Sequence, residues 1–140
     1  MKDKHSLYMD MAKVWSKNSK AKRRKVGALI VLDGNIISDG YNGTPHKFDN
    51  NCEWRVKNEY VSKPEVLHAE SNAITKLAKS TQSSDGATLY VTTAPCFDCA
   101  KLIIQAGIKK VYWQDEYRNV DGLILLKRAN IHTKRIKYED

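Results

Sequence analysis

The chain has 140 residues, enough to bury one hydrophobic core, and no shift in composition divides it, so we expect a single domain over residues 1–140. Apolar residues make up 41% and charged residues 29%, as in an ordinary globular protein, and no apolar run approaches the roughly 20 residues of a transmembrane helix. The formal net charge of +8 favours anionic partners, such as nucleotides or nucleic acid. Three cysteines and no signal-peptide pattern lead us to expect a reducing compartment, the cytoplasm.

The first part of the chain is predicted to form a helix, a β-hairpin and a long loop. Four apolar residues at helical spacing predict a helix over 4–18, and we expect them to form its inner face: Tyr8, Met11, Ala12 and Trp15. The apolar run 26–32 predicts a buried strand, and the Asp-Gly pair after it predicts a tight turn into a second strand over 35–41. Residues 42–64 are polar and contain two prolines, so we expect a loop, and loops of this length are usually functional.

The rest of the chain alternates between helical and strand patterns. We expect helices over 66–79, 96–106 and 121–129, and strands over 87–92, 108–113 and 131–138. The first of these helices has four apolar residues on its expected inner face: Ala69, Ala73, Ile74 and Leu77. A hairpin followed by helix–strand repeats predicts an α/β fold, a three-layer α/β/α sandwich around a five-stranded mixed sheet.

Three side chains at the starts of two predicted helices have the types and spacing of zinc ligands. Cys96 and Cys99 are three residues apart, which aims both sulfurs at one point, and His68 can complete a three-ligand site. Three protein ligands leave a fourth position open for water, whose pKa zinc lowers to about 7. Glu70, two residues after His68, is placed to move protons. This combination is the signature of zinc-dependent nucleobase deaminases.

Two less specific interpretations of the cysteines are weaker. A structural zinc site normally has four ligands, and the remaining candidates form no second close pair: Cys52, His5, His46 and His132. A redox Cys-x-x-Cys pair would leave His68 and Glu70 unexplained. The sequence therefore favours a catalytic zinc site with one open position.

Three segments of the chain, residues 40–45, 68–74 and 92–101, together resemble the deoxycytidylate (dCMP) deaminases, and the compact length is similar to phage-type members of the cytidine/deoxycytidylate deaminase family. The resemblance extends from Tyr8 to Ile131. It implies a cytidine deaminase-like fold and zinc-dependent hydrolysis of dCMP to dUMP and ammonia, which supplies dUMP for thymidylate synthesis. In this mapping the three ligands hold Zn²⁺ and Glu70 transfers protons.

The resemblance also implies substrate and effector sites. Arg23 and Arg118 are the candidates for binding the 5′-phosphate, Asn42 for the sugar or base edge, and Tyr117 for packing on the nucleotide. Three neighbours compete for the phosphate: Lys22, Arg24 and Lys25. Relatives are often homohexamers activated by dCTP and inhibited by dTTP, with Mg²⁺ on the triphosphate. The effector-binding loop is expected to include Gly43, Thr44, Lys47 and Asp49. In this loop His46-Lys47 replaces a glycine that many relatives have after the Pro-x pair.

Two other functions compete with this interpretation. The basic run 20–25 is compatible with a tRNA or polynucleotide base deaminase of the same superfamily, but it contains no aromatic residue for base stacking, so nucleic acid is not the expected partner. A noncatalytic zinc-stabilised binding module is the other alternative. Glu70 argues against it, because a purely structural site does not need that carboxylate.

Overall fold

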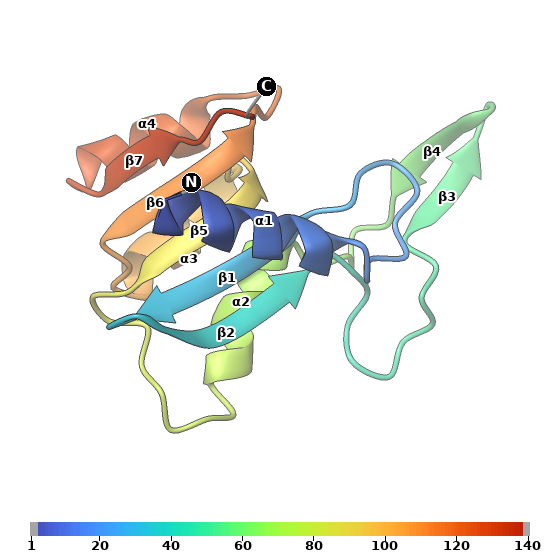
Figure 1. Cartoon of the computed structure of the whole chain (residues 1–140). Helices are drawn as coiled ribbons and strands as arrows, with labels where there is room; N and C mark the ends of the chain where they lie inside the picture. Colours follow the sequence, from blue (N-terminus) through green and yellow to red (C-terminus); the bar gives the residue numbers. More distant parts are fainter. Residues whose placement is uncertain (1–2, 139–140) are drawn as a thin grey trace.

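A mixed five-stranded sheet forms the centre of the computed structural model, which describes residues 3–138 (Figure 1). β1 (Gly27–Leu32) pairs antiparallel with β2 (Asn35–Tyr41) and with β5 (Thr88–Thr93). β6 (Lys110–Asp115) and β7 (His132–Arg135) extend the sheet in parallel, which gives the order β2-β1-β5-β6-β7. The Asp-Gly turn predicted between β1 and β2 is confirmed, and both of its residues, Asp33 and Gly34, have positive φ (51° and 78°).

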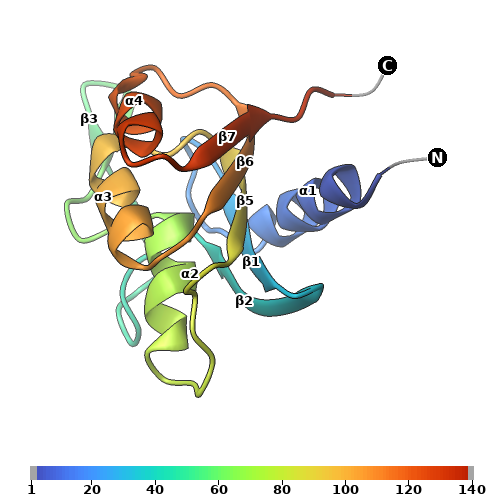
Figure 2. The ribbon, with the colours of Figure 1, turned by 90° about the vertical axis from the view of Figure 1, so that its left-hand side faces the viewer.

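Helices cover both faces of this sheet (Figure 2). α1 (Lys4–Ser16) lies on one face, whereas α2 (Ala69–Leu77), α3 (Phe97–Gln105) and α4 (Asp121–Arg128) lie on the other. The α/β/α sandwich with a five-stranded mixed sheet is thereby confirmed. Among the described residues, none of the helices is both long and apolar enough to cross a membrane.

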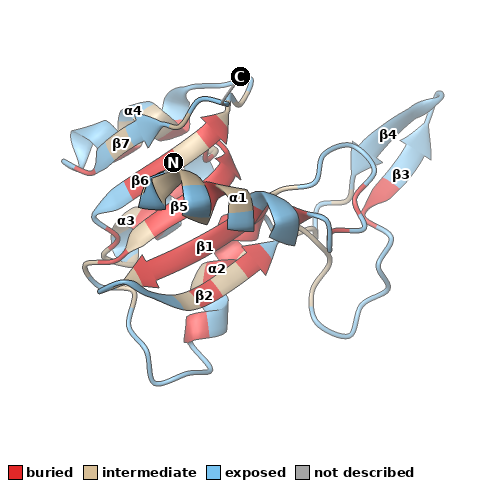
Figure 3. Cartoon of the chain, viewed as in Figure 1, coloured by how far each residue is buried: buried red, intermediate tan, exposed pale blue. Residues whose placement is uncertain are grey.

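The apolar run of β1 is explained by burial on both of its sides. Ala28 and Ile30 point into a core shared with α2, α3 and α4, whereas Leu29 and Val31 point into a second core under α1. A strand covered on both faces has no polar side, so its sequence reads as a continuous apolar run rather than an alternation. Figure 3 shows this buried central strand beside more exposed edges of the sheet.

The buried face of α1 agrees with the predicted one at Ala12 and at Tyr8, which packs against the second core, but differs at the other two positions. The helix buries Met9, Ala12 and Ser16, whereas Met11 (47% exposed) and Trp15 (39% exposed) face outward. The close approach of α1 to β1 explains the difference: a Cβ at Gly27 would meet the Ala12 carbonyl oxygen and lie 2.8 Å from the Ser16 nitrogen. Backbones that approach this closely leave room only for small side chains, so Ala12 and Ser16 face the sheet.

The predicted loop over 42–64 is also partly wrong. It contains a two-stranded antiparallel sheet, β3 (Glu53–Val56) and β4 (Glu59–Ser62), which extends away from the central sheet (Figure 1). Its turn residues, Lys57 and Asn58, both have positive φ (49° and 66°), as in the tight turns that match strand twist. The strands were not predicted because each is only four residues long, so the alternation of polar and apolar residues over Glu53–Val56 is too short to stand out, and every residue except Glu53 is exposed.

Several element ends shift by one to three residues. α2 begins at Ala69 rather than 66, because His68 has extended backbone and acts as the N-cap, and α3 begins after Cys96 for the same reason. The last strand is limited to 132–135 instead of 131–138. The single domain over 1–140 stays a prediction, and its terminal residues, 1–2 and 139–140, lie outside the described part of the chain.

Candidate metal centre and substrate pocket

The three expected metal ligands lie together where α2 and α3 begin. His68 is the N-cap residue of α2, and Cys96 is the N-cap of α3, where its sulfur accepts a hydrogen bond from the Cys99 N–H at 3.5 Å. The Nδ1 atom of His68 is 3.4 Å from the Cys96 sulfur and 3.3 Å from the Cys99 sulfur. Zinc bonds of about 2.3 Å to sulfur and 2.0 Å to nitrogen place such atoms about 3.5 Å apart in a tetrahedron. The cluster therefore has the spacing and donor types for a zinc ion.

The charges of the two cysteines also indicate a cation site. A hydrogen bond from the Cys99 side chain lowers the pKa of the Cys96 thiol to about 4, and the His68 imidazole adds to this effect. The Cys96 sulfur and burial raise the pKa of Cys99, because a second thiolate beside the first is unfavourable. The Cys96 sulfur in turn raises the pKa of His68. Only an added positive charge would let both sulfurs be thiolates at neutral pH.

Glu70 is a buried carboxyl group beside this cluster. It lies in the first turn of α2 and is 4% exposed. Burial raises the pKa of Glu70 to about 7, since the charged form loses its solvation. A cation bound by the neighbouring ligands would pull that pKa back down by favouring the carboxylate. A carboxyl group beside the candidate ligands can accept and release protons, as general acid–base chemistry requires.

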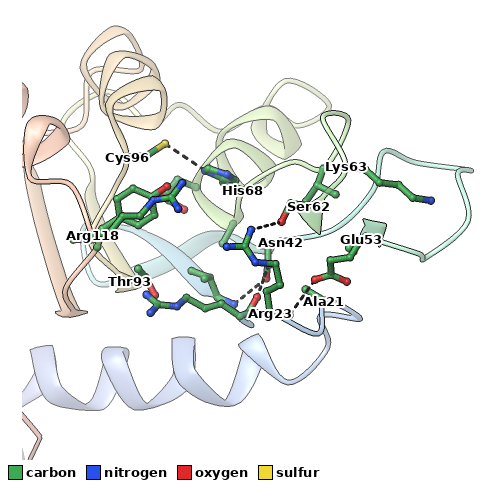
Figure 4. A pocket seen from close by; sticks show the side chains of 18 of the residues that line it. Ala21, Arg23, Asn42, Glu53, Ser62, Lys63, His68, Thr93, Cys96 and Arg118 are labelled. Atoms are coloured by element: carbon green, nitrogen blue, oxygen red, sulfur yellow. Dashed lines mark hydrogen bonds between the residues drawn. The ribbon is translucent and has the colours of Figure 1, made fainter. Parts of the chain in front are cut away.

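A pocket of about 500 Å³ joins the metal cluster to the expected substrate residues. His68, Glu70 and Cys96 line it, and Cys99 lies behind them, 3% exposed. The same pocket is lined by the four residues expected to bind substrate: Arg23, Asn42, Tyr117 and Arg118. These residues come from distant parts of the chain (Figure 4). The fold thus brings every expected zinc, proton-transfer and substrate residue to one place.

The pocket wall is strongly basic. Arg24 and Lys63 line it in addition to Arg23 and Arg118, and within residues 3–138 no carboxylate forms an ion pair with any of the three arginines. Arg24 donates to the Glu116 carbonyl oxygen at 3.5 Å, and the Arg118 guanidinium lies 5.8 Å from the centre of the Tyr117 ring. Guanidinium groups that lack carboxylate partners are suited to bind a phosphate.

The competing lysines of the basic run do not share this position. Lys22 turns toward the β3–β4 hairpin, with its Nζ 5.1 Å from the centre of the Tyr60 ring, and neither Lys22 nor Lys25 lines the pocket. The geometry therefore favours the arginines over the lysines as the phosphate-facing residues of this run.

Asn42 has a second role that the sequence did not indicate. Its Oδ1 accepts a hydrogen bond from the Val26 N–H at 2.8 Å, and its Nδ2 donates to the Arg24 carbonyl oxygen at 2.8 Å. The side chain thus ties the end of the basic run to the start of β1. One amide hydrogen of Asn42 remains for a ligand.

The expected effector residues lie outside this pocket. None of Gly43, Thr44, Lys47 and Asp49 lines it, and the Thr44 hydroxyl closes the loop by donating to the Asp49 carbonyl oxygen. Lys47 has a φ of 71°, the left-handed region that favours glycine. An exposed lysine thus has a backbone conformation here that glycine adopts more readily.

Several lining residues were missed because they belong to the unpredicted hairpin or its flanks. Four of them contribute to the wall of the pocket: Cys52, Glu53, Ser62 and Lys63. The pair of short runs around Lys57-Asn58 was the available signal, since Asn can adopt the positive φ that such turns need.

Comparison with known proteins agrees with this geometry. Residues 2–115 match the family model described as the cytidine and deoxycytidylate deaminase zinc-binding region. A crystal structure of dCMP deaminase from cyanophage S-TIM5, in complex with dCMP and dUMP, superposes with a TM-score of 0.90 at 44% identity, covering 97% of this chain and 99% of that chain. ComE operon protein 2 of Bacillus subtilis (strain 168) is 38% identical over 97% of this chain and 72% of its own length. Deoxycytidylate deaminase of Enterobacteria phage T4 is 35% identical over 81% of this chain and 79% of its own length.

The matched region spans most of the chain and contains the cluster of His68, Cys96 and Cys99. This chain therefore belongs to the cytidine and deoxycytidylate deaminase family.

Proposed function

We propose that the chain catalyses the zinc-dependent hydrolytic deamination of dCMP to dUMP and ammonia. One observation carries the proposal: a single pocket joins the His68, Cys96 and Cys99 cluster and the buried Glu70 to arginines that have no carboxylate partner among residues 3–138. The relative from cyanophage S-TIM5, which is bound to dCMP and dUMP, supports this choice of substrate.

The pocket residues fall into two groups: those that activate water and transfer protons, and those that bind the substrate. A zinc ion held by His68, Cys96 and Cys99 would supply water activated for attack at neutral pH. Glu70, next to these ligands, takes a proton from the attacking water and delivers it to the ring nitrogen beside the amino-bearing carbon. It then takes the second proton from the hydroxyl group now on that carbon and passes it to the amino group, whose C–N bond breaks, so that dCMP and water give dUMP and ammonia.

Substrate binding is assigned to other residues that line the same pocket. Arg23 and Arg118 bind the 5′-phosphate, since guanidinium pairs with phosphate through two parallel hydrogen bonds. The free amide hydrogen of Asn42 contacts the sugar or base edge, and Tyr117 packs on the nucleotide. A phosphate held by two arginines orients the ring for reaction at the metal cluster.

Ammonia release tests the proposal and its alternatives in one experiment. The purified protein is mixed separately with dCMP, deoxycytidine, dCTP and a cytosine-containing oligonucleotide. We expect deamination of dCMP to be much faster than of the other three. Faster reaction of the oligonucleotide would instead support a polynucleotide deaminase, and no reaction with any of them by the zinc-loaded protein would support a noncatalytic zinc module.

The regulation and assembly implied by the family resemblance belong to the same proposal. We infer that the chain forms a homo-oligomer, a homohexamer, and acts in the cytoplasm, that of a host cell if a phage encodes it, to supply dUMP for thymidylate synthesis. One side of α1 supports assembly, because it exposes four apolar side chains: Leu7, Met11, Val14 and Trp15.

We further propose that Mg²⁺-bound dCTP activates the enzyme and that dTTP inhibits it, both through the loop residues Gly43, Thr44, Lys47 and Asp49. Light scattering and assays with each triphosphate test these parts.

A further inference from the structure

The β3–β4 hairpin contacts the basic run through its first pair of residues. Glu53 and Ser62 are directly opposite each other in the antiparallel pairing of β3 and β4. The Glu53 carboxylate accepts hydrogen bonds from the backbone N–H groups of Lys22 (2.8 Å) and Arg23 (3.1 Å). The Ser62 hydroxyl accepts one from the Arg23 guanidinium at 3.3 Å (Figure 4). This cross-strand pair of the hairpin therefore holds both the backbone and the side chain of Arg23.

Glu53 is unusual as a buried carboxylate in a basic pocket. It is 5% exposed, and within residues 3–138 it forms no ion pair with a lysine or an arginine. Burial of a charge is unfavourable unless hydrogen bonds compensate for lost water, and two backbone N–H donors provide that compensation here. Because these donors are backbone groups, Glu53 fixes the position of the chain and leaves the arginine charges available to a ligand.

The basic run is anchored on both sides of Arg23. After Arg23, the Asn42 side chain donates a hydrogen bond to the Arg24 carbonyl oxygen. Before Arg23, the Lys22 side chain lies over the Tyr60 ring of the hairpin. Arg23 lies between these anchors, and its guanidinium is directed by Ser62 toward the pocket that both residues line. Such an arrangement reduces the freedom that a long side chain must lose when it binds a ligand.

We propose that Glu53 and Ser62 are positioning residues, which present the Arg23 guanidinium to the phosphate of the substrate. The hairpin then serves the reaction through Arg23 and does not touch the reacting atoms. This inference rests on the proposed function, in which Arg23 binds the dCMP phosphate.

The first test is the Ser62→Ala variant, which removes only the contact to the Arg23 side chain. We expect KM for dCMP to rise about 3- to 10-fold, with kcat within about twofold of the wild type; the rise is smaller than for loss of a charged hydrogen bond to the substrate, because the Arg23 guanidinium stays and loses only its support. Ser62→Thr keeps the hydroxyl and should restore KM. Glu59→Ala, at the other end of β4, is the matched control and should leave both constants unchanged. A KM for Ser62→Ala within twofold of wild type would overturn the inference.

Variants of Glu53, assayed with dCMP and with deoxycytidine, separate a positioning role from general damage to the fold. Glu53→Ala should raise KM for dCMP by about 10-fold or more, whereas Glu53→Gln, which keeps one carbonyl acceptor, should recover part of this loss. Deamination of deoxycytidine, which has no phosphate, should change less than threefold in both variants. Equal losses on dCMP and deoxycytidine would show that Glu53 only stabilises the fold.

A double-mutant cycle with Arg23→Ala decides whether the hairpin acts through that residue. In the Arg23→Ala background, Ser62→Ala should change KM for dCMP by less than twofold, because the contact has already been removed. If Ser62→Ala raised KM by the same factor in the wild-type and Arg23→Ala backgrounds, Ser62 would not act through Arg23. A wild-type protein inactive on dCMP would overturn both this inference and the proposed function, whereas an active wild type with an unchanged Ser62→Ala variant would overturn the inference alone.

Discussion

Gly122 of α4 lies directly against the backbone of Cys96, and a Cβ at Gly122 would be 2.8 Å from the Cys96 carbonyl oxygen. The same Cβ would also meet the Pro95 carbonyl oxygen. Both atoms belong to the backbone that leads into α3, so they cannot move aside as a flexible side chain could. The packing of α4 therefore sets the position of a candidate metal ligand at the start of the neighbouring helix.

We expect Gly122→Ala to destabilise the protein by about 1–3 kcal/mol, because the added methyl group forces apart a close backbone contact. The displaced Cys96 should also bind zinc more weakly. Thermal unfolding and the zinc content after dialysis measure the two effects. Ile124→Ala, on an exposed position of the same helix, is the control. Wild-type stability and zinc content in Gly122→Ala would contradict this account of the contact.

Cys99→Ala should release the metal and lower the stability of the fold, because metal binding holds the starts of α2 and α3 together. Metal analysis of the purified variant gives the answer directly. Lys101→Ala, which removes an exposed side chain from the same helix, should retain full zinc content. Full zinc occupancy in Cys99→Ala would rule out Cys99 as a ligand.

Glu70→Gln should keep the fold and the zinc but lose most turnover of dCMP, because an amide cannot take up and deliver the protons. General acid–base groups contribute on the order of 10²- to 10⁴-fold, and we expect the upper end because Glu70 serves several transfers. The measurement is kcat at saturating dCMP, together with zinc content. The exposed Glu65 offers the matched control, Glu65→Gln. A Glu70→Gln enzyme within a few-fold of wild type would exclude the proton-transfer role.

Arg118→Ala should lower kcat/KM for dCMP by about 10- to 100-fold, which corresponds to the loss of a charged hydrogen bond, and should leave deoxycytidine nearly unaffected. Arg128→Ala removes an equal charge from α4 and serves as the control. The assay is run with and without saturating dCTP, so that an effect on the effector response can be recognised. Equal losses for both substrates under both conditions would make Arg118 structural.

His5 should make stability depend on pH. Its ring lies 4.4 Å from the Tyr112 ring, its Nδ1 is 2.6 Å from the Tyr90 hydroxyl, and partial burial lowers the pKa of His5 below its usual value near 6.5. The unfolded chain therefore binds a proton at this residue before the folded chain does. The stability contributed by neutral His5 is complete above about pH 6.5 and is lost as the pH falls from there toward the folded-state pKa.

The comparison of wild type with His5→Phe isolates this effect, since protonation of the metal ligands at low pH affects both proteins alike. Unfolding by urea is measured at pH 7.5 and pH 5.5. We expect the wild type to lose more stability over this range than His5→Phe. Parallel losses in the two proteins would show that His5 does not contribute.

The sequence alone determined the features that depend on local spacing. The separation of Cys96 and Cys99 places both sulfurs on one side of a helix start, so this pair of candidate ligands could be predicted from local spacing, whereas its meeting with His68 depends on how two helices pack. The turn between β1 and β2 and the α/β sandwich follow from equally local patterns, an Asp-Gly pair and alternating helix and strand periods. These predictions needed no knowledge of which elements meet.

The tertiary structure decided what depends on contact between distant segments. The buried face of α1 follows from its close approach to Gly27, which only small residues permit, and apolar spacing alone could not show that contact. The hairpin that carries Glu53 and Ser62 is short and mostly exposed. Its contacts with Arg23 span 30 or more residues, so no local sequence pattern predicts them. The position of Arg23 on the pocket wall and of Lys22 outside it depends on hydrogen bonds and ring contacts made across 30 or more residues, and a one-dimensional pattern does not contain such contacts.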